Sequence, residues 1–371
     1  MVELKRVIKP AVWLVYVLVV FEILFMISPF ALHFYAAYGP TLNVLHRSSA
    51  TAWLTQFYLP HFTETASPVL NAVGPLGGAL IAVGLTAFLV AAIPVYWAKF
   101  RGRGPVTGGL YATIRHPQYV ALAITGLGTA LLWPRFLVLV TFVTMIFLYA
   151  WLAQWEEQQC VARFGDSYRD YQKRSGRFVP KRLADRLPTI LPRKGTARRV
   201  ILAVAWPVTT VLTVAVGFMV RDHALGQVAA IYADDRAVLS PARLSTGELR
   251  TAYELSLTHP EVQHALEGAS DARFVVYVVP SEWLLPDLPL DVEHPPRGHH
   301  VPRDFDRTRH KVLVTRARFH GAAPSGAGIV KAAYGRYPLV VAHVDLRAGA
   351  VEQVLAAPPQ VFWGDIPTPM F

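Results

Sequence analysis

Residues 117–157 read PQYVALAITGLGTALLWPRFLVLVTFVTMIFLYAWLAQWEE, a strongly apolar stretch that is broken near its middle by Pro134 and Arg135. A helix that crosses a bilayer needs roughly 20 apolar residues. Residues 136–154 meet this requirement, and residues 117–133 are marginal. The Pro-Arg break predicts a tight turn between two antiparallel helices. We therefore expect a helical hairpin whose two ends, near His116 and Glu156, return to the same face of a membrane.

Further apolar runs at 11–35, 72–97 and 200–220 flank this hairpin. Only 16% of the 371 residues are charged, against about 25% in soluble domains. The run at 11–35 is longer than the apolar region of about 7–15 residues in a signal peptide, so we expect it to be a retained helix. These runs predict an α-helical integral membrane bundle of about five transmembrane helices. Gly74 and Gly78 are spaced for helix packing.

Lysine and arginine alternate between rich and poor loops, and such residues collect on the cytoplasmic side of a membrane. The loop 36–68 holds only Arg47, whereas the first flank and the loops around the hairpin are rich in bases, among them Lys5, Arg6, Lys9, Lys99, Arg101, Arg103, Arg115, Arg169, Lys173 and Arg174. We predict a multi-pass protein with a cytoplasmic N-terminus and an extracytoplasmic C-terminal domain. The net charge of +11 then reflects contacts with membrane lipids. The bases form no stripe that suits nucleic acid.

The chain divides into four predicted regions. Residues 1–65 contain the first helix and an outer segment with Trp53, Phe57, Tyr58 and Phe62, which suits either the membrane interface or a packed loop. Residues 66–197 form the membrane core, and 198–220 form the last span. Residues 221–371 change to short alternating runs, typical of a soluble α+β domain. Strands are expected at 273–279, 311–319 and 338–346, a hairpin turn at 347–350, and helices within 247–267.

The role of this domain is open from sequence, and a protein partner for it is possible. His294, His299 and His300 form a cluster in a long loop, but their spacing lacks acidic or Cys ligands, so we predict no metal. A single Cys160 excludes an intrachain disulfide. Glu22, inside the first span, suits either a functional role or pairing with another helix. The oligomeric state is also open.

Two motifs carry chemistry. The first is GLYATIRHPQY at 109–119; the second begins with Glu156-Glu157, continues as FGDSYRDY at 164–171 and ends in FVP at 178–180. The hairpin brings both to one cytoplasmic membrane boundary. Adjacent carboxylates at the end of a span need water, a partner or a cation. Aromatic rings such as those of Tyr111, Tyr119 and Tyr168 can face a cation.

Arg-His-Pro-x-Tyr, a hairpin, Glu-Glu and Phe-Gly-x-x-Tyr-x-x-Tyr together resemble the isoprenylcysteine carboxyl methyltransferase family, whose wider group includes phospholipid N-methyltransferases. The resemblance covers roughly residues 70–182. It implies a membrane methyltransferase that uses S-adenosylmethionine and takes a lipophilic acceptor from the bilayer. The cofactor-binding residues are then expected to be Tyr111, Arg115, His116, Pro117, Tyr119, Glu156, Glu157 and Tyr168. The family usually has Gly two positions after the motif Tyr, where this chain has Ala121, which still permits close helix approach.

The acceptor decides the expected catalytic residues. A carboxylate acceptor, as in an isoprenyl-cysteine, needs an Arg to orient it, and Arg163 suits this role. A phospholipid amine or a small thiol needs a base to remove a proton, and Glu157 suits that role. Two other functions are compatible with the sequence. One is a non-enzymatic membrane sensor or anchor with an extracytoplasmic binding domain. The other is a reductase of isoprenoid or sterol double bonds, although no dinucleotide fingerprint follows a strand.

Overall fold

The computed structural model describes residues 42–61, 63–186, 196–267, 272–283 and 304–357. The predicted first span, Glu22 and the cluster of His294, His299 and His300 lie outside the described residues. The chain divides into two compact units. The helical unit holds residues 73–133 and 137–216, and the second unit holds, among the described residues, 42–72, 134–136 and 217–357.

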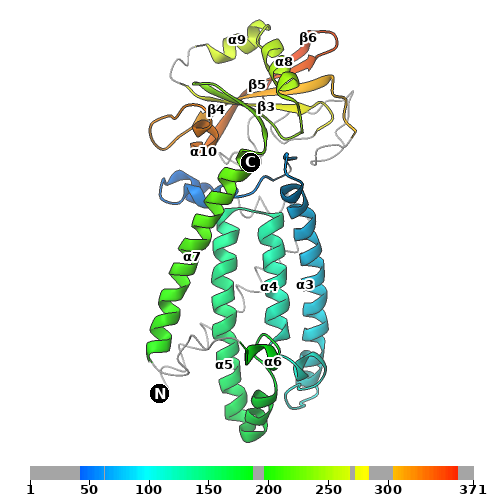
Figure 1. The fold of residues 1–371 in the computed structure, drawn as a ribbon, viewed down its shortest axis with the longest axis vertical. Coiled ribbons are helices and arrows are strands. Elements are labelled where there is room, and N and C mark those ends of the chain that lie inside the picture. The colour runs from blue at the N-terminus through cyan, green and yellow to red at the C-terminus, as the bar shows by residue number, and fades with distance from the viewer. Residues whose placement is uncertain (1–41, 62, 187–195, 268–271, 284–303, 358–371) are drawn as a thin grey trace. The chain divides into compact units, whose positions relative to one another are not determined.

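The helical unit is built from α3 (Pro68–Phe100), α4 (Pro117–Leu132), α5 (Phe136–Arg174) and α7 (Thr196–Leu225), with the short η2 (Gly109–Ala112) and α6 (Lys181–Ala184) near the ends of the longer helices (Figure 1). Within the described chain, three helices are long and apolar enough to cross a membrane, at Pro68–Ala98, Phe136–Arg174 and Val200–Leu225. The predicted hairpin of α4 and α5 is confirmed. With 16 residues, α4 reaches only about 24 Å at 1.5 Å per residue, and the predicted span at 11–35 lies outside the described residues. The expected count of five spans is therefore not confirmed.

Close approach of α3 and α4 depends on glycines at their contact. A Cβ added to Gly77 would lie 2.7 Å from the carbonyl oxygen of Gly128, and one added to Gly84 would lie 2.7 Å from the backbone nitrogen of Thr125. Among the described residues, no atom outside the helix's own backbone lies within 4 Å of the positions that a Cβ would take at Gly74 or Gly78. Within the part of the chain that the structure describes, Gly74 and Gly78 therefore do not make the packing contact that their spacing predicts. Gly77, one position away, faces α4 instead.

The second unit contains a six-stranded sheet in the order β1-β2-β3-β4-β5-β6. Its strands are β1 (Ala229–Tyr232), β2 (Arg236–Ser240), β3 (Phe274–Pro280), β4 (Arg309–Arg318), β5 (Gly335–Asp345) and β6 (Ala350–Ala356). The pairing of β2 with β3 is parallel, because α8 (Thr246–Ser256) and α9 (Pro260–Leu266) connect them, and the other pairs are antiparallel. The predicted α+β domain, its three strands, its helices and its hairpin turn are confirmed.

Helices cover both faces of this sheet (Figure 1). Leu249 and Val262, from α8 and α9, pack with Val276 and Val314 on one face. Ile329 and Val330 of α10 (Gly328–Ala332) pack on the other face with Trp283, Val275 and Leu225. The sheet is therefore buried on both sides, which accounts for the continuous apolar run of β3.

The described residues of the outer segment 42–66 belong to this second unit. Phe57 is 1% exposed and Tyr58 is 6% exposed. The guanidinium of Arg135 lies over the Phe57 ring at 4.3 Å, and Arg221 Nε donates to the Phe57 carbonyl at 3.0 Å. Of the two interpretations of this segment, the packed loop is the one that the buried rings support. The second unit thus combines residues from three separate stretches of the chain.

Candidate functional site

The first motif forms a short loop that leads into α4. Residues 109–112 form η2, and Pro117 occupies the first turn of α4, where its missing N–H is unneeded. The Tyr111 hydroxyl donates to the carbonyl of Ala91 in α3 at 3.0 Å. Burial, with smaller contributions from Tyr171 and Glu156, raises the pKa of Tyr111 well above its usual range. Tyr111 therefore acts as a neutral hydrogen-bond donor that fixes the loop to α3.

The second motif reverses direction at Gly165. This residue has φ 58° and ψ −130° inside the segment Phe136–Arg174, a conformation that essentially only glycine adopts. Past this point Tyr168 and Tyr171 are buried and contact each other edge to face at 5.5 Å. The Tyr171 hydroxyl donates to the carbonyl of Tyr111 at 2.6 Å. The kink therefore lets the end of α5 pack against the first motif.

Backbone hydrogen bonds join the first motif to residues 175–177, which we call the strap. Arg115 N–H donates to the Gly176 carbonyl at 2.8 Å, Gly176 N–H donates to Thr113 at 3.1 Å, and His116 N–H donates to the Arg177 carbonyl at 3.1 Å. A Cβ at Gly176 would lie 1.7 Å from the carbonyl oxygen of Val179. Only glycine fits there, so the turn after α5 is set by its sequence.

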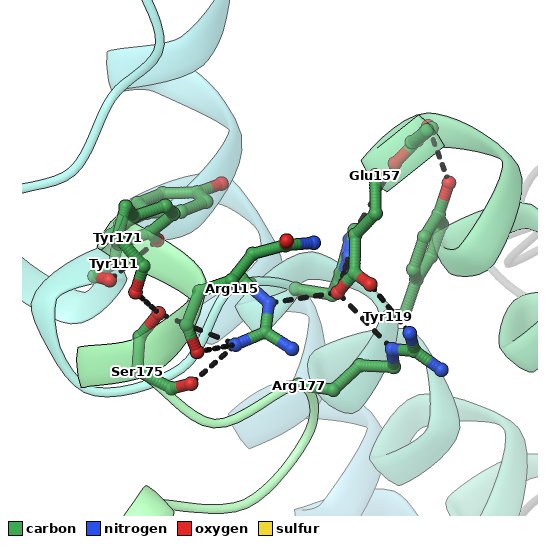
Figure 2. A network of polar contacts seen from close by, with 10 residues as sticks. Tyr111, Arg115, Tyr119, Glu157, Tyr171, Ser175 and Arg177 are labelled. Carbon is green, nitrogen blue, oxygen red and sulfur yellow. Dashed lines mark hydrogen bonds and ion pairs between the residues drawn. The ribbon is translucent and has the colours of Figure 1, made fainter. Parts of the chain in front are cut away.

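Glu157 lies at the centre of a charged network (Figure 2). Its side chain is 5% exposed, and Arg115 Nε donates to Oε1 at 2.7 Å. Arg177 Nε donates to the same oxygen at 3.1 Å, and Arg177 Nη2 donates to Oε2. Arg115 Nη1 also donates to the carbonyl of Gln172 at 3.1 Å and to that of Ser175. Two guanidinium groups thus satisfy this buried carboxylate, as a buried charge requires.

Glu156, the adjacent residue, has different surroundings. Its side chain is 31% exposed. It accepts a hydrogen bond from the Tyr119 hydroxyl at 2.7 Å, and His116 Nδ1 lies 3.5 Å from its other oxygen. The Tyr119 ring stacks on His116 at 5.6 Å and on Tyr149 at 5.3 Å. This leaves a half-exposed carboxylate beside a stack of aromatic rings.

His116 contacts both carboxylates, since its Nε2 lies 3.3 Å from Glu157 Oε1. Burial alone would lower the pKa of His116. The hydrogen bonds and charges of Glu156 and Glu157 outweigh that effect and raise this pKa above its usual value. The two carboxylates therefore favour the charged form of the imidazole.

The structure brings most of the predicted site residues together and places two of them apart. The loop, the start of α4 and the Glu pair form one cluster, which contains Tyr111, Arg115, His116, Pro117, Tyr119, Glu156 and Glu157. Tyr168 packs against Tyr171 beside this cluster. Arg163 is exposed, with its guanidinium 5.3 Å from the ring centre of Phe164, and lies outside the Glu157 network.

Arg177 is the member of the network that sequence reasoning missed. It belongs to a run of bases after the hairpin, and the positive-inside pattern accounts for such bases without assigning any of them a contact. The sequence did offer one signal for a contact of Arg177 with the site. Arg177 directly precedes Phe178-Val179-Pro180, the end of the second motif. Phe178 also contacts His116, with ring centres 5.9 Å apart.

The Glu156 surroundings fit a cationic ligand with an amino group. A half-exposed carboxylate can accept charge-assisted hydrogen bonds from an ammonium group, and the rings beside it suit a cation. Among the residues that the structure describes, no group of three or more His, Cys, Asp and Glu side chains has the arrangement of a metal site.

Comparison with known proteins assigns the segment that carries this site. Residues 76–167 match the model of the phospholipid methyltransferase family. A stretch of 76 residues is 37% identical to the Protein-S-isoprenylcysteine O-methyltransferase of Schizosaccharomyces pombe. This stretch covers 20% of this chain and 32% of that protein. The chain thus matches about a third of the length of this curated relative. No solved structure matches the chain. Residues 76–167, from α3 to the second motif, are therefore similar to the phospholipid methyltransferase family, and this is the wider group that the motifs predicted.

Proposed function

We propose that this protein transfers a methyl group from S-adenosylmethionine to a lipophilic acceptor at the end of the α4–α5 hairpin. The observation that carries the proposal is the half-exposed Glu156 carboxylate, held by Tyr119 and His116 within a segment of a methyltransferase family. When bound, the cofactor supplies an electrophilic methyl group on a sulfonium. The protein contributes binding, orientation and exclusion of water.

Glu156 would accept hydrogen bonds from the amino group of the cofactor. Tyr119 and His116 hold this carboxylate in place, so it is oriented before the ligand arrives. Tyr111, Arg115 and Pro117 fix the loop beside Glu156, and Tyr168 packs against Tyr171, which bonds to this loop. Holding donor and acceptor in reactive geometry can lower a barrier by about 7–11 kcal/mol, so the reaction does not depend on a strong acid or base.

The structure bears differently on the two expected catalytic residues. Two guanidinium groups on Glu157 favour its charged form and disfavour proton uptake, which argues against a role as base. Arg163 is exposed, so its guanidinium can approach an acceptor that carries a carboxylate. We therefore keep Arg163 as the residue that orients a carboxylate acceptor and assign Glu157 a structural role in the site. The name of the fungal relative supports an acceptor of this class.

The acceptor would enter from the bilayer, and the site would face the cytoplasm. The outer surface of α3 exposes Val83, Leu89, Val90 and Ile93, which suits contact with lipid. His116 and Trp133 cap opposite ends of α4, so the site and the turn at Pro134 lie at opposite ends of the hairpin. Arg101, Arg103 and Arg115, near the site end, support its cytoplasmic placement. The second unit, which includes the turn, would then be extracytoplasmic.

Calorimetric titration of the purified protein with S-adenosylmethionine tests this function. The unaltered protein should bind, and Glu156→Gln should bind about tenfold or more weakly, because a hydrogen bond to a charged group contributes about 1.5–3 kcal/mol. His116→Ala should also weaken binding. Asp166→Asn, at an exposed residue of the same segment, is the control. The proposal fails if the protein binds no cofactor or if both site variants bind as tightly as the unaltered protein.

A further inference from the structure

Arg177 contacts the site in two independent ways. Its backbone carbonyl accepts the hydrogen bond of His116 N–H, and its side chain forms a forked pair with Glu157. The same residue therefore touches the start of α4 through its backbone and α5 through its guanidinium. The side chain is only 30% exposed, so solvent screens this pair weakly.

The Oε1 atom of Glu157 is where three cationic groups converge. Arg115 Nε, Arg177 Nε and His116 Nε2 lie 2.7, 3.1 and 3.3 Å from it. Arg177 alone also holds Oε2. Arg115 is fixed further by carbonyls of the chain around the strap, whereas Arg177 directs its Nε and Nη2 to Glu157. Arg177 thus offsets part of the negative charge of Glu157, and this charge is the one that acts on His116.

We propose that Arg177 is a positioning residue that keeps Glu157 paired, so that Glu156 alone receives the amino group of the cofactor. The assignment rests on the proposed function for the identity of the ligand. Both glutamates sit at the same end of the hairpin, and an unpaired Glu157 would compete for an ammonium group at a second position. A forked guanidinium pair occupies both oxygens of Glu157 and removes that competition.

The charges around His116 give the proposal a signature that packing alone does not produce. Glu156 and Glu157 face the imidazole from α5, Arg115 precedes it, Tyr119 stacks on it from α4, and the strap adds Arg177, followed by Phe178. Removal of the Arg177 charge leaves the negative charge of Glu157 less compensated. The pKa of His116 should then rise, and Glu157→Gln should lower it.

The two substitutions therefore have opposite expected signs. A residue that only holds the strap in place would, on removal, loosen both carboxylates from His116 and let its pKa fall toward the usual value. The sign of the shift in Arg177→Gln separates the two roles.

The experiment is a titration of the full-length protein in detergent, with ¹³C-labelled histidine followed by NMR. The His116 signal is identified by its loss in His116→Gln. We expect an upward shift of the His116 pKa in Arg177→Gln, a downward shift in Glu157→Gln, and none in Arg169→Gln, a control at an exposed arginine that pairs with Asp166. Arg177→Lys keeps the charge without the fork, so its His116 pKa should stay close to that of the unaltered protein.

Calorimetry with S-adenosylmethionine on the same variants completes the test. Arg177→Gln should bind the cofactor about tenfold or more weakly, Arg177→Lys should fall in between, and Arg169→Gln should match the unaltered protein. A downward or absent pKa shift in Arg177→Gln overturns the proposal, and so does full cofactor affinity in that variant. If the unaltered protein binds no S-adenosylmethionine, the proposed function fails, while the NMR titration still reports on the role of Arg177.

Discussion

At the scale of single residues, two adjacent glutamates have different environments. Neighbouring positions on a helix point about 100° apart because there are about 3.6 residues per turn. Glu157 consequently meets two arginines in a buried position, and Glu156 meets a tyrosine and a histidine in a half-exposed one. A pair of titratable groups in contrasting environments is a common basis for divided roles in an active site. Here the contrast separates a structural carboxylate from one that can bind a ligand.

The charge of His116 predicts a pH dependence of stability. An unfolded histidine has a pKa of about 6.5, and the two carboxylates raise the folded value above it. The stabilisation by the charged imidazole is therefore complete below about pH 6.5 and is lost as the pH rises through the folded pKa. Thermal unfolding in detergent, measured from pH 6 to 9, should show a larger fall of the midpoint in the unaltered protein than in His116→Gln. Parallel curves for the two proteins would contradict this prediction.

At the scale of elements, the contact of α3 with α4 depends on a seven-residue spacing of small residues. Gly77 and Gly84 approach the backbone of α4, and Ala91, which is 1% exposed, follows at the same spacing. The carbonyl of Ala91 accepts the hydrogen bond of Tyr111. The face of α3 that packs against α4 therefore continues to the loop that carries the first motif.

Two neighbouring glycines of α3 provide a matched test of this contact. Gly77→Ala should destabilise the protein by about 1–3 kcal/mol, because overpacking forces backbone shifts. Gly78→Ala meets no atom of the described residues beyond its own helix within 4 Å and should be neutral or slightly stabilising, since alanine favours helix over glycine by about 1 kcal/mol. Thermal unfolding followed by circular dichroism measures both. Equal midpoints would show that the two helices do not pack at Gly77.

At the scale of the whole molecule, the second unit collects residues from before, between and after the helices. Glu64 N–H donates to the carbonyl of Pro241, and Tyr58 N–H donates to that of Pro134. His320 lies over the Tyr334 ring at 3.7 Å, and its Nε2 lies 3.2 Å from the His46 carbonyl oxygen. We therefore expect the described parts of segment 42–66, the hairpin turn and residues 217–357 to lie on the same side of a membrane.

A single natural cysteine makes this topology testable by labelling. In a Cys160→Ser background, Ser48→Cys and Ser325→Cys introduce thiols at exposed positions of the second unit, and Thr107→Cys and Ser167→Cys do so near the site. A membrane-impermeant maleimide added to intact cells should label the first two. The other two should react only after the membrane is permeabilised. Labelling of Thr107→Cys and Ser325→Cys from the same side would contradict the proposed orientation.

The sequence predicted local patterns well and long-range partners less well. The strands at Phe274–Pro280 and Arg309–Arg318 follow from alternation and β-branched residues, and the hairpin follows from the Pro-Arg break. The choice of Gly74 and Gly78 failed because α3 is apolar on all sides, so its pattern does not reveal which face meets α4. Arg177 was missed because its partner is 20 positions away, across a reversal at Gly165, and its charge had a sufficient explanation in membrane orientation.

Because the second unit is divided among three stretches of chain, the order of synthesis constrains when this unit can fold. Residues 42–66 leave the ribosome before α3, and the sheet that receives them follows α7, with nearly the whole membrane core made in between. Chains usually fold domain by domain from the N-terminus, but here the Phe57 carbonyl can accept its hydrogen bond from Arg221 only after Arg221 has been synthesised. A chain that terminates before α7 would therefore keep the contacts of Phe57 and Tyr58 with Arg135 and Phe136 but lack the hydrogen bond from Arg221.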